Sequence, residues 1–308
     1  PSYVFRNDGG SFTDVTKEWM PAAEGLGILN EARFANVAGD ETPELILAGE
    51  WMPITVFQKE GDIWKDKTKE LGLSDVLGWW RTTTAADFDG DGDLDLIAGN
   101  EGINSQFMAD REKPMVVDYG DLDGNGRFDA VVSQYYDDVL APIYSLPDMA
   151  AQMRYFMNTH YKFHEDFANT TTEAFLAKTK PAQRLKVNEL RSMYFENTGN
   201  GFVAKPLPVG AQIAPLFNFH VTDVNGDGNL DVMGAGNSYD NKVEFGWTDA
   251  LHGLVLLGDG RGDFNEIVHS GFDAGYNAKR IRPITIKGQL HYLVSNNHEK
   301  LQLFKYTK

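Results

Sequence analysis

A nine-residue motif, D-x-[DN]-G-[DN]-G-x-x-D, occurs three times in this chain of 308 residues. The copies are Asp87–Asp95, Asp121–Asp129 and Asp223–Asp231. Each copy places a side-chain oxygen at positions 1, 3, 5 and 9 and a glycine at positions 4 and 6. Calcium takes about six to eight oxygen ligands from carboxylates, amides and backbone carbonyls, and glycine lets a short loop bend around an ion. The motif therefore predicts three calcium-binding loops.

The predicted calcium ligands are the side chains at positions 1, 3, 5 and 9 of the three loops. They are Asp87, Asp89, Asp91, Asp95, Asp121, Asp123, Asn125, Asp129, Asp223, Asn225, Asp227 and Asp231. An EF-hand is excluded, because its loop ends in a bidentate Glu at the twelfth position, which here is Ala98, Val132 or Gly234. Ordinary Asp/Gly-rich turns are the simpler alternative for a single loop. Three copies with one spacing favour metal loops.

The three loops contain eleven of the 45 acidic residues of the chain. The formal net charge is −17, and three divalent ions would reduce it to −11. The remaining charge argues against nucleic-acid binding, which needs a basic footprint, and against adhesion to anionic membranes. Weak calcium sites fill where calcium is near millimolar, so we expect an extracytoplasmic location: secreted, periplasmic or at the cell surface.

Two further features of the sequence do not fix the compartment in which the protein is found. There are no cysteines and therefore no disulfides, and no apolar run approaches the roughly 18 residues of a membrane-spanning helix. The chain begins at Pro1 and carries no signal peptide, so we expect it to be a module of a longer, processed protein.

The elements that must position the loops repeat along the chain. Each loop leads into an apolar strand, and further copies lie at Asn36–Glu44, where the loop has lost oxygen ligands, and at 280–294, where a short turn replaces it. Hairpin patterns recur at 3–12, 54–63, 193–202 and 254–264, with a half copy at 301–305.

Four strands per repeat predict an all-β fold. We expect a β-propeller of about five four-stranded antiparallel blades, alone or as part of a larger propeller. A parallel β-helix is the alternative, but its rungs are shorter.

One interval between loops is too long for a single repeat. Asp121 and Asp223 are 102 residues apart, whereas Asn36 and Asp87 are 51 apart. The excess falls in about 140–190, where capping signals at Ser145 and at 170–173 predict helices. We therefore expect one propeller domain over 1–308, with a helical insertion at about 140–190 within the third repeat. The Met-rich stripe of the insertion is expected to pack in a core.

The stretches 87–100 and 223–237 resemble FG-GAP/VCBS repeats, which build bacterial and integrin-α-like β-propellers. The resemblance covers nearly the whole chain, and the insertion followed by 193–202 resembles VCBS-repeat proteins of bacterial cell envelopes and secretomes. In this family the aspartate loops bind calcium and stabilise the blade, so the resemblance implies the same twelve ligands. The FG-GAP tetrapeptide itself is absent from these stretches, and the family's integrin-like ligand use does not carry over.

No catalytic residue can be assigned from the sequence, and calcium is the single cofactor that it implies. His160 and His164 are followed by Glu165 rather than arranged as His-Glu-x-x-His, so the zinc-protease signature fails. No nucleophile elbow, P-loop or dinucleotide fingerprint is present.

The strand order predicts a ligand-binding face opposite the calcium loops, where first strands begin and second strands end. The residues expected there are Trp51, Trp80, Arg81, Asn100, Tyr136, Asn237, Trp247 and His298. Aromatic and amide groups suit stacking on sugars or anchoring of peptides, although the tryptophans could equally fill the space between blades. The sequence thus favours a binding module for a glycan or protein. A polysaccharide lyase or hydrolase acting on the same face is the alternative.

Overall fold

Antiparallel strands dominate the computed structural model, which describes residues 2–39 and 42–307. Contacts between residues divide the chain into two compact units. The first consists of Pro1–Gln106 and Leu190–Lys308, and the second is Phe107–Glu189. Helices are short, and none of those in the described part of the chain is long and apolar enough to cross a membrane.

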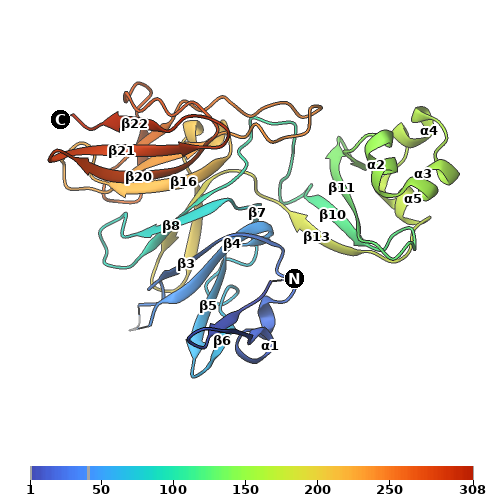
Figure 1. Cartoon of the computed structure of the whole chain (residues 1–308), viewed down its shortest axis with the longest axis horizontal. Coiled ribbons are helices and arrows are strands. Elements are labelled where there is room, and N and C mark those ends of the chain that lie inside the picture. The colour runs from blue at the N-terminus through green and yellow to red at the C-terminus, as the bar shows by residue number, and fades with distance from the viewer. Residues whose placement is uncertain (1, 40–41, 308) are drawn as a thin grey trace. The chain divides into compact units, whose positions relative to one another are not determined.

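The first unit contains three four-stranded antiparallel paths, one three-stranded sheet and a small hairpin (Figure 1). The first path is β3 (Ile28–Ala35), β4 (Glu44–Pro53), β5 (Thr55–Glu60) and β6 (Ile63–Asp66), with β7 (Leu77–Trp79) paired to β4. The second is β8 (Thr82–Ala86), β9 (Asp95–Gly99), β14 (Met193–Asn197) and β15 (Phe202–Pro206). The third is β16 (Leu216–Thr222), β17 (Asp231–Gly236), β18 (Leu254–Gly258) and β19 (Phe264–Glu266). The three-stranded sheet is β20 (Ala278–Ile286), β21 (Gln289–Asn296) and β22 (Gln302–Lys305), and the hairpin is β1 (Phe5–Asn7) and β2 (Phe12–Asp14).

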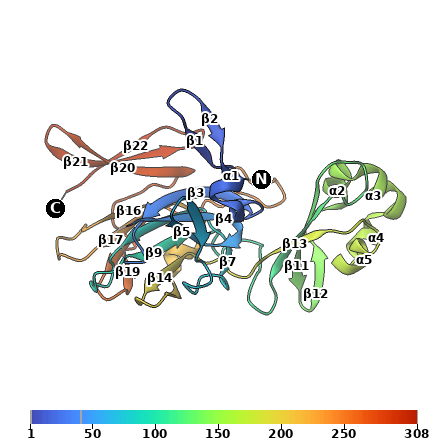
Figure 2. The same ribbon diagram turned by 90° about the horizontal axis from the view of Figure 1, so that it is seen from below.

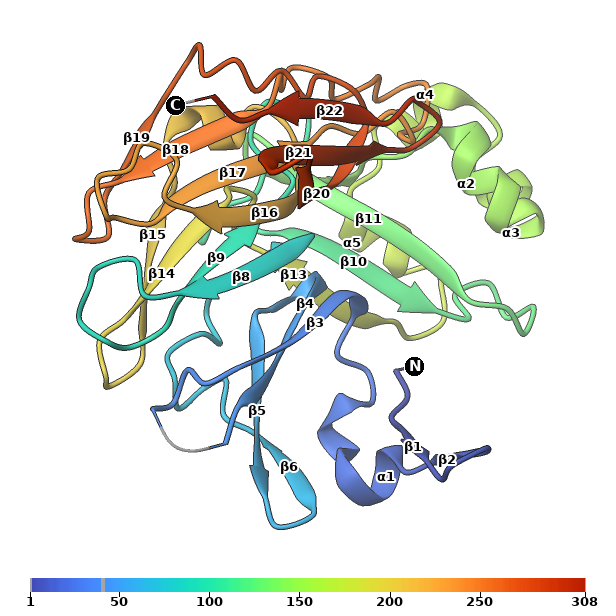
Figure 3. The same ribbon diagram turned by 60° about the vertical axis from the view of Figure 1, so that its left-hand side comes forward.

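The first strands of successive sheets lie next to one another in chain order. β3 contacts β8, β8 contacts β16, and β16 contacts β20 (Figure 3). Hydrogen bonds join these neighbours: Arg33 Nη2 donates to the Thr83 carbonyl at 2.8 Å, and the Ile281 backbone N–H donates to Asn218 Oδ1 at 2.8 Å. Inner strands that adjoin in sequence order are the arrangement of propeller blades. The predicted all-β, propeller-like fold is confirmed.

The hydrophobic cores of the first unit lie between successive sheets. Ile46 of β4 and Phe195 of β14 pack in one core with Trp80, whose ring meets Phe195 edge-on at 5.7 Å between centroids. Leu216 and Leu254 belong to the next core. β9 and β17 are buried along their whole length, which explains their continuous runs of apolar and small residues.

The second unit is a four-stranded antiparallel sheet with helices on one side (Figures 1 and 2). Its strands, in sheet order, are β12 (Val139–Pro142), β11 (Asp129–Tyr136), β10 (Met115–Gly120) and β13 (Gln183–Val187). Its helices are α2 (Leu146–Gln152), α3 (Arg154–His160), α4 (His164–Ala168) and α5 (Thr172–Leu176). Ser145 caps α2 as predicted, accepting from the Asp148 N–H. Met149, Met153 and Met157 are fully buried in this unit's core, as the Met-rich stripe predicted.

The inserted segment is longer than the sequence indicated and interrupts a different repeat. β9 pairs directly with β14, through Leu96 with Phe195 and Ala98 with Met193. Residues 107–189 therefore separate two neighbouring strands of the second sheet, whereas the sequence predicted an insertion of about 140–190 in the third repeat. The prediction was misled because β10 and β11 repeat the strand–loop–strand pattern of the propeller repeats, so that a sheet within the insertion resembled the next blade. The same error counted the Asp121–Asp129 sheet as one of about five blades in a single domain.

Candidate functional site

The first residue of each motif organises the loop through the glycine backbone. Asp87 Oδ1 accepts from the Gly90 N–H at 2.7 Å, and its Oδ2 accepts from the Gly92 N–H at 3.1 Å. Both glycines have positive φ, at 78° and 99°, a conformation that residues with a side chain resist. Asp223 accepts from Gly226 and Gly228 in the same manner, at 2.6 and 3.0 Å. The two loops therefore share one backbone path.

Side chains at positions 3 and 5 form successive turns within each loop. Asp89 Oδ1 accepts from the Asp91 N–H at 3.2 Å, and Asn225 Oδ1 accepts from the Asp227 N–H at 2.9 Å. Oxygens of Asp87, Asp89 and Asp91 lie within 4.8 Å of one another, as do oxygens of Asp121, Asp123 and Asp129. Such groups of hard oxygen donors suit a hard cation such as calcium.

The acid at position 9 is buried and ties the loop to the sheet. Asp95 is 0% exposed; its Oδ2 accepts from the Phe88 N–H at 3.0 Å and its Oδ1 from the Asn197 N–H at 2.7 Å. Asp231 makes the equivalent contacts with Val224 and Gly258, at 2.7 and 3.0 Å. In these two loops the ninth position thus joins the loop to the third strand of its sheet, a structural role that the sequence did not predict.

Electrostatic repulsion acts on the acids that converge in the loops. Burial, with the neighbouring charges of Asp91 and Asp87, raises the pKa of Asp89 above its ordinary value. Burial, with the charge of Asp123, likewise raises the pKa of Asp129. A bound divalent cation would offset both the burial of charge and the repulsion.

The residues present fit calcium in the first two loops. Asp121 Oδ1 is buried and has no hydrogen-bond partner, which leaves an oxygen available to a cation. In the third loop, position 3 is Asn225, and no group of three converging acids forms there among the described residues. The amide oxygen of Asn225 would have to serve in its place. The twelve-ligand assignment remains a prediction.

The loop expected to be metal-free, Asn36–Glu44, is described only in part, because Asp40 and Glu41 lie outside the described residues. Glu44 holds the ninth position, and its Oε2 accepts from the Val37 and Ala38 N–H groups at 2.9 and 3.0 Å. The ninth acid therefore still closes its own loop where other ligand positions are lost, but its Oε1 is buried without a hydrogen-bond partner.

A lysine distinguishes the second loop from the others. Lys180 Nζ lies 3.8 Å from Asp121 Oδ2 and would compete with a cation for this carboxylate. We expect Lys180→Gln to raise the calcium affinity of this loop severalfold, and less in high salt because the lysine is exposed. Calorimetric titration of the variant tests this, with Lys186→Gln, in β13 of the same unit, as the matched control. Unchanged affinity would show that Lys180 does not oppose the metal.

On the opposite side of the first unit, four of the expected ligand-face residues are buried. They are Trp51, Trp80, Asn100 and Asn237. Asn100 Oδ1 accepts from the Trp79 N–H at 3.1 Å, and Asn237 Nδ2 donates to the Leu251 carbonyl at 2.7 Å. These four side chains close the ends of strands and fill the core, so the prediction that they contact a ligand is corrected: Trp80, Asn100 and Asn237 are fully buried and Trp51 is buried over most of its surface.

The exposed members of the set are Trp247, His298 and, in the second unit, Tyr136. Trp247 is 66% exposed and stacks on Tyr239, with 4.9 Å between ring centroids and 17° between planes. The pair forms a flat aromatic surface of the kind on which sugar rings stack.

Arg81 is mostly buried in a network of charges. Its guanidinium pairs with Glu50 and, at 2.8 Å, with Glu101. Burial raises the pKa of Glu101 above its ordinary value, opposed by the charge of Arg81. Nearby, Lys279 Nζ lies 3.5 Å from the centroid of the Phe217 ring, and burial lowers the pKa of this lysine to about 8. The burial of Lys279 and its contact with Phe217 could not be predicted from the sequence.

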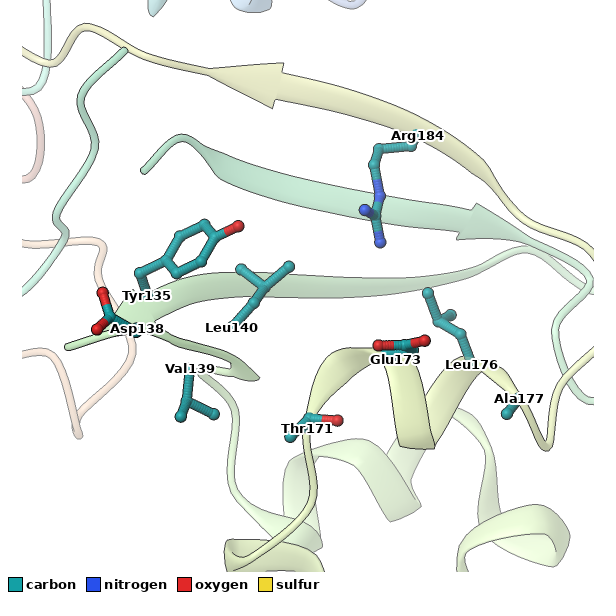
Figure 4. Close-up of a pocket in the computed structure, with 9 residues that line it drawn as sticks. All are labelled: Tyr135, Asp138, Val139, Leu140, Thr171, Glu173, Leu176, Ala177 and Arg184. Atoms are coloured by element: carbon teal, nitrogen blue, oxygen red, sulfur yellow. The ribbon is translucent and has the colours of Figure 1, made fainter. Parts of the chain in front are cut away.

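The second unit has a hollow of its own, of about 650 Å³, between β11, β12, β13 and α5 (Figure 4). Leu140, Glu173, Leu176 and Arg184 surround it. Arg184 is already bound by the buried carboxylate of Asp118, at 2.7 and 2.8 Å. Its charge is thus compensated within the protein, which weakens the hollow as an anion site.

Residues 36–98 match the family model described as an FG-GAP-like repeat. The matched range runs from the loop after β3 through the Asp87–Asp95 loop into β9. No curated protein matches the chain. Among solved structures, the chain is similar to a lectin of Agrocybe aegerita described as recognising non-reducing terminal N-acetylglucosamine. The identity is 16%, the alignment covers 99% of this chain and 74% of that one, and the TM-score is 0.29.

Proposed function

We propose that the chain, which carries an FG-GAP-like repeat, is a calcium-stabilised propeller-like binding module of an extracytoplasmic protein, with a glycan or protein as its ligand. The main support is the convergence of acidic oxygens within 4.8 Å in two of the three motif loops. The buried, unpartnered Asp121 Oδ1 is a second support. Calcium at the loops would be structural, because the ninth acid of each loop is buried and hydrogen-bonded to the backbone of its own loop. Ligand binding is therefore expected on the opposite side, at groups that remain exposed.

A binding screen with and without EDTA tests ligand binding and its dependence on calcium together. Immobilised glycans and candidate proteins are screened with calcium-saturated chain and with chain treated with EDTA. The proposal expects binding that is lost or weakened when calcium is removed, because the sheets that carry the face lose their loop restraints. Binding that is indifferent to calcium would separate the loops from the function.

Lys279 and Glu101 supply the specific observation in favour of an enzyme. A lysine whose pKa is about 8 can act as a base near neutral pH, and Glu101 is a buried acid with a raised pKa. A lyase would use the lysine to remove a proton beside a sugar carboxylate. Incubation with acidic polysaccharides, followed by the ultraviolet absorbance of unsaturated ends, decides between binding alone and turnover.

Trp247 is the residue whose change best tests the aromatic surface. We expect Trp247→Ala to weaken glycan binding about tenfold, because stacking area is lost at an exposed position, while calcium affinity stays unchanged. Trp80→Ala is the contrasting variant. Removal of this fully buried ring should lower the free energy of unfolding by about 3–5 kcal/mol. Calorimetry and thermal melts of both variants distinguish the two roles. Loss of calcium affinity in Trp247→Ala would mean that the two faces are wrongly assigned.

A further inference from the structure

We propose that the hollow at the starts of the four inner strands of the first unit binds a carboxylate-bearing sugar, such as a uronic-acid residue of an acidic glycan. The proposal rests on the binding function above and specifies the class of ligand. It concerns a different surface from the Tyr239–Trp247 pair, of which Trp247 is exposed.

The hollow has a volume of about 360 Å³ and is built from four sheets. Its lining residues are Asn30 and Glu31 of β3, Arg81 and Thr82 at β8, Phe217 of β16, Lys279 and Arg280 of β20, and Ser295 of β21. The motif loops follow the other ends of β8 and β16. The hollow therefore lies at the end of the inner strands opposite the calcium loops, and it exists only when the sheets are assembled side by side.

The charges around the hollow favour an anion. Glu31 is the one acid in the lining, and its carboxylate already accepts from the Thr82 hydroxyl at 2.8 Å and pairs with Arg33 at 3.2 Å. Lys279 and Arg280 form no ion pair with any described residue. Arg81, by contrast, is already paired with Glu50 and Glu101, so Lys279 and Arg280 are the cations of the lining with which an anion would pair.

Lys279 is the group that an anion would satisfy most directly. Its Nζ donates to the Asn237 carbonyl at 3.2 Å and lies over the Phe217 ring. Burial lowers its pKa to about 8; among the charges that face it, Asp240 and Glu101 raise the pKa while Arg81 lowers it further. A carboxylate placed in the hollow would supply the counter-charge that burial denies the ammonium group.

The neutral groups of the lining suit the hydroxyls of a sugar. Asn30 donates its amide N–H to the Trp80 carbonyl at 2.9 Å, which leaves its amide oxygen as an acceptor. Ser295 adds a hydroxyl group to the lining, whereas the buried Thr82 hydroxyl is already bound to Glu31. The volume lies at the lower end of the range of about 300–1,000 Å³ for small-ligand pockets. It therefore fits the end of a glycan better than an extended peptide.

The test uses pairs of ligands that differ in one group. Methyl glucuronide and methyl galacturonide are titrated by calorimetry into the calcium-saturated full chain, each against its neutral methyl glycoside. The proposal expects at least one acidic glycoside to bind about tenfold more tightly than its neutral partner. Lys279→Gln should lose this preference, and Lys300→Gln, in the exposed loop after β21, should keep it.

The dependence on pH gives a readout that a structural role of Lys279 would not produce. Because the carboxylate prefers the ammonium form, affinity should fall as the pH rises through about 8. Lys279→Arg should still bind but should lose this dependence, since arginine stays charged. Thermal melts of both variants in calcium establish that they fold.

Three outcomes overturn the proposal. The first is that no acidic glycoside binds more tightly than its neutral partner, and the second is that Lys279→Gln leaves the preference intact. The third is that a glutamate hexapeptide competes as well as the glycosides, which would make the hollow a peptide site. Calcium binding is measured on the same samples. If calcium binds and the glycosides do not, the inference about the hollow fails while the calcium-stabilised module stands.

Discussion

Asp95→Ala is expected to lower the stability of the first unit by about 3 kcal/mol, or roughly 10 °C in the midpoint of its thermal unfolding. The buried carboxylate accepts from two backbone N–H groups, those of Phe88 and Asn197. Alanine would leave both donors buried without a partner. It would also remove a predicted calcium ligand, so the loss should be larger in calcium than in EDTA. Thermal and urea unfolding under both conditions measure the two contributions.

Asp93→Ala is the matched control for this prediction. Asp93 lies in the same loop and carries the same charge, but it occupies position 7, outside the 1, 3, 5 and 9 set. We expect a change within about 0.5 kcal/mol, as for most surface substitutions. If Asp93→Ala destabilises as much as Asp95→Ala, the loss arises from loop charge in general and not from the hydrogen bonds of the ninth position.

Removal of calcium should have the second large effect. A ligand that binds only the folded state stabilises it by about 2.7 kcal/mol per site at 100 times its Kd. Two of the motif loops belong to the first unit and one to the second. Relative to protein in calcium at 100 times Kd, EDTA should therefore lower the free energy of unfolding of the first unit by about 5 kcal/mol and that of the second unit by about half as much.

Calorimetric melts with calcium and with EDTA measure these losses, and magnesium in place of calcium is the control. Magnesium should restore little of the stability lost with calcium, because it demands closer, octahedral ligands and dehydrates reluctantly. Identical melts in calcium and EDTA would mean that the hydrogen bonds of the loops suffice to order them.

The sequence predicted local features of this fold better than its connections. Three loops of identical spacing, the helix cap at Ser145 and the buried methionines could all be predicted, because each depends on residues close together in the chain. The pairing of β9 with β14 could not be predicted, since the whole second unit, residues 107–189, lies between the two strands in the chain and no local pattern marks strands that meet across such a distance. The Asp121–Asp129 loop made the error worse, because its pattern is that of a propeller repeat.

The calcium loops and the opposite face also differ in how well the sequence could predict them. Ligand oxygens follow from residue type and spacing within nine residues, whereas the opposite face depends on burial. Trp80 and Trp247 are both tryptophan on segments assigned to one face, but the first is fully buried and the second is 66% exposed. Composition cannot separate these roles, because tryptophan serves equally as a core residue and as a binding surface. The chemistry of Lys279 likewise arises from burial, which lowers its pKa to about 8, and burial cannot be deduced from residue type.

The number of calcium ions bound per chain tests the central claim most directly. Calorimetric titration of metal-free protein, with anomalous scattering from crystals grown in calcium, gives both the stoichiometry and the positions. The account predicts three ions, at Asp87–Asp95, Asp121–Asp129 and Asp223–Asp231, and none at Asn36–Glu44. Fewer than two ions in calcium-saturated protein, or ions bound away from these loops, would contradict it.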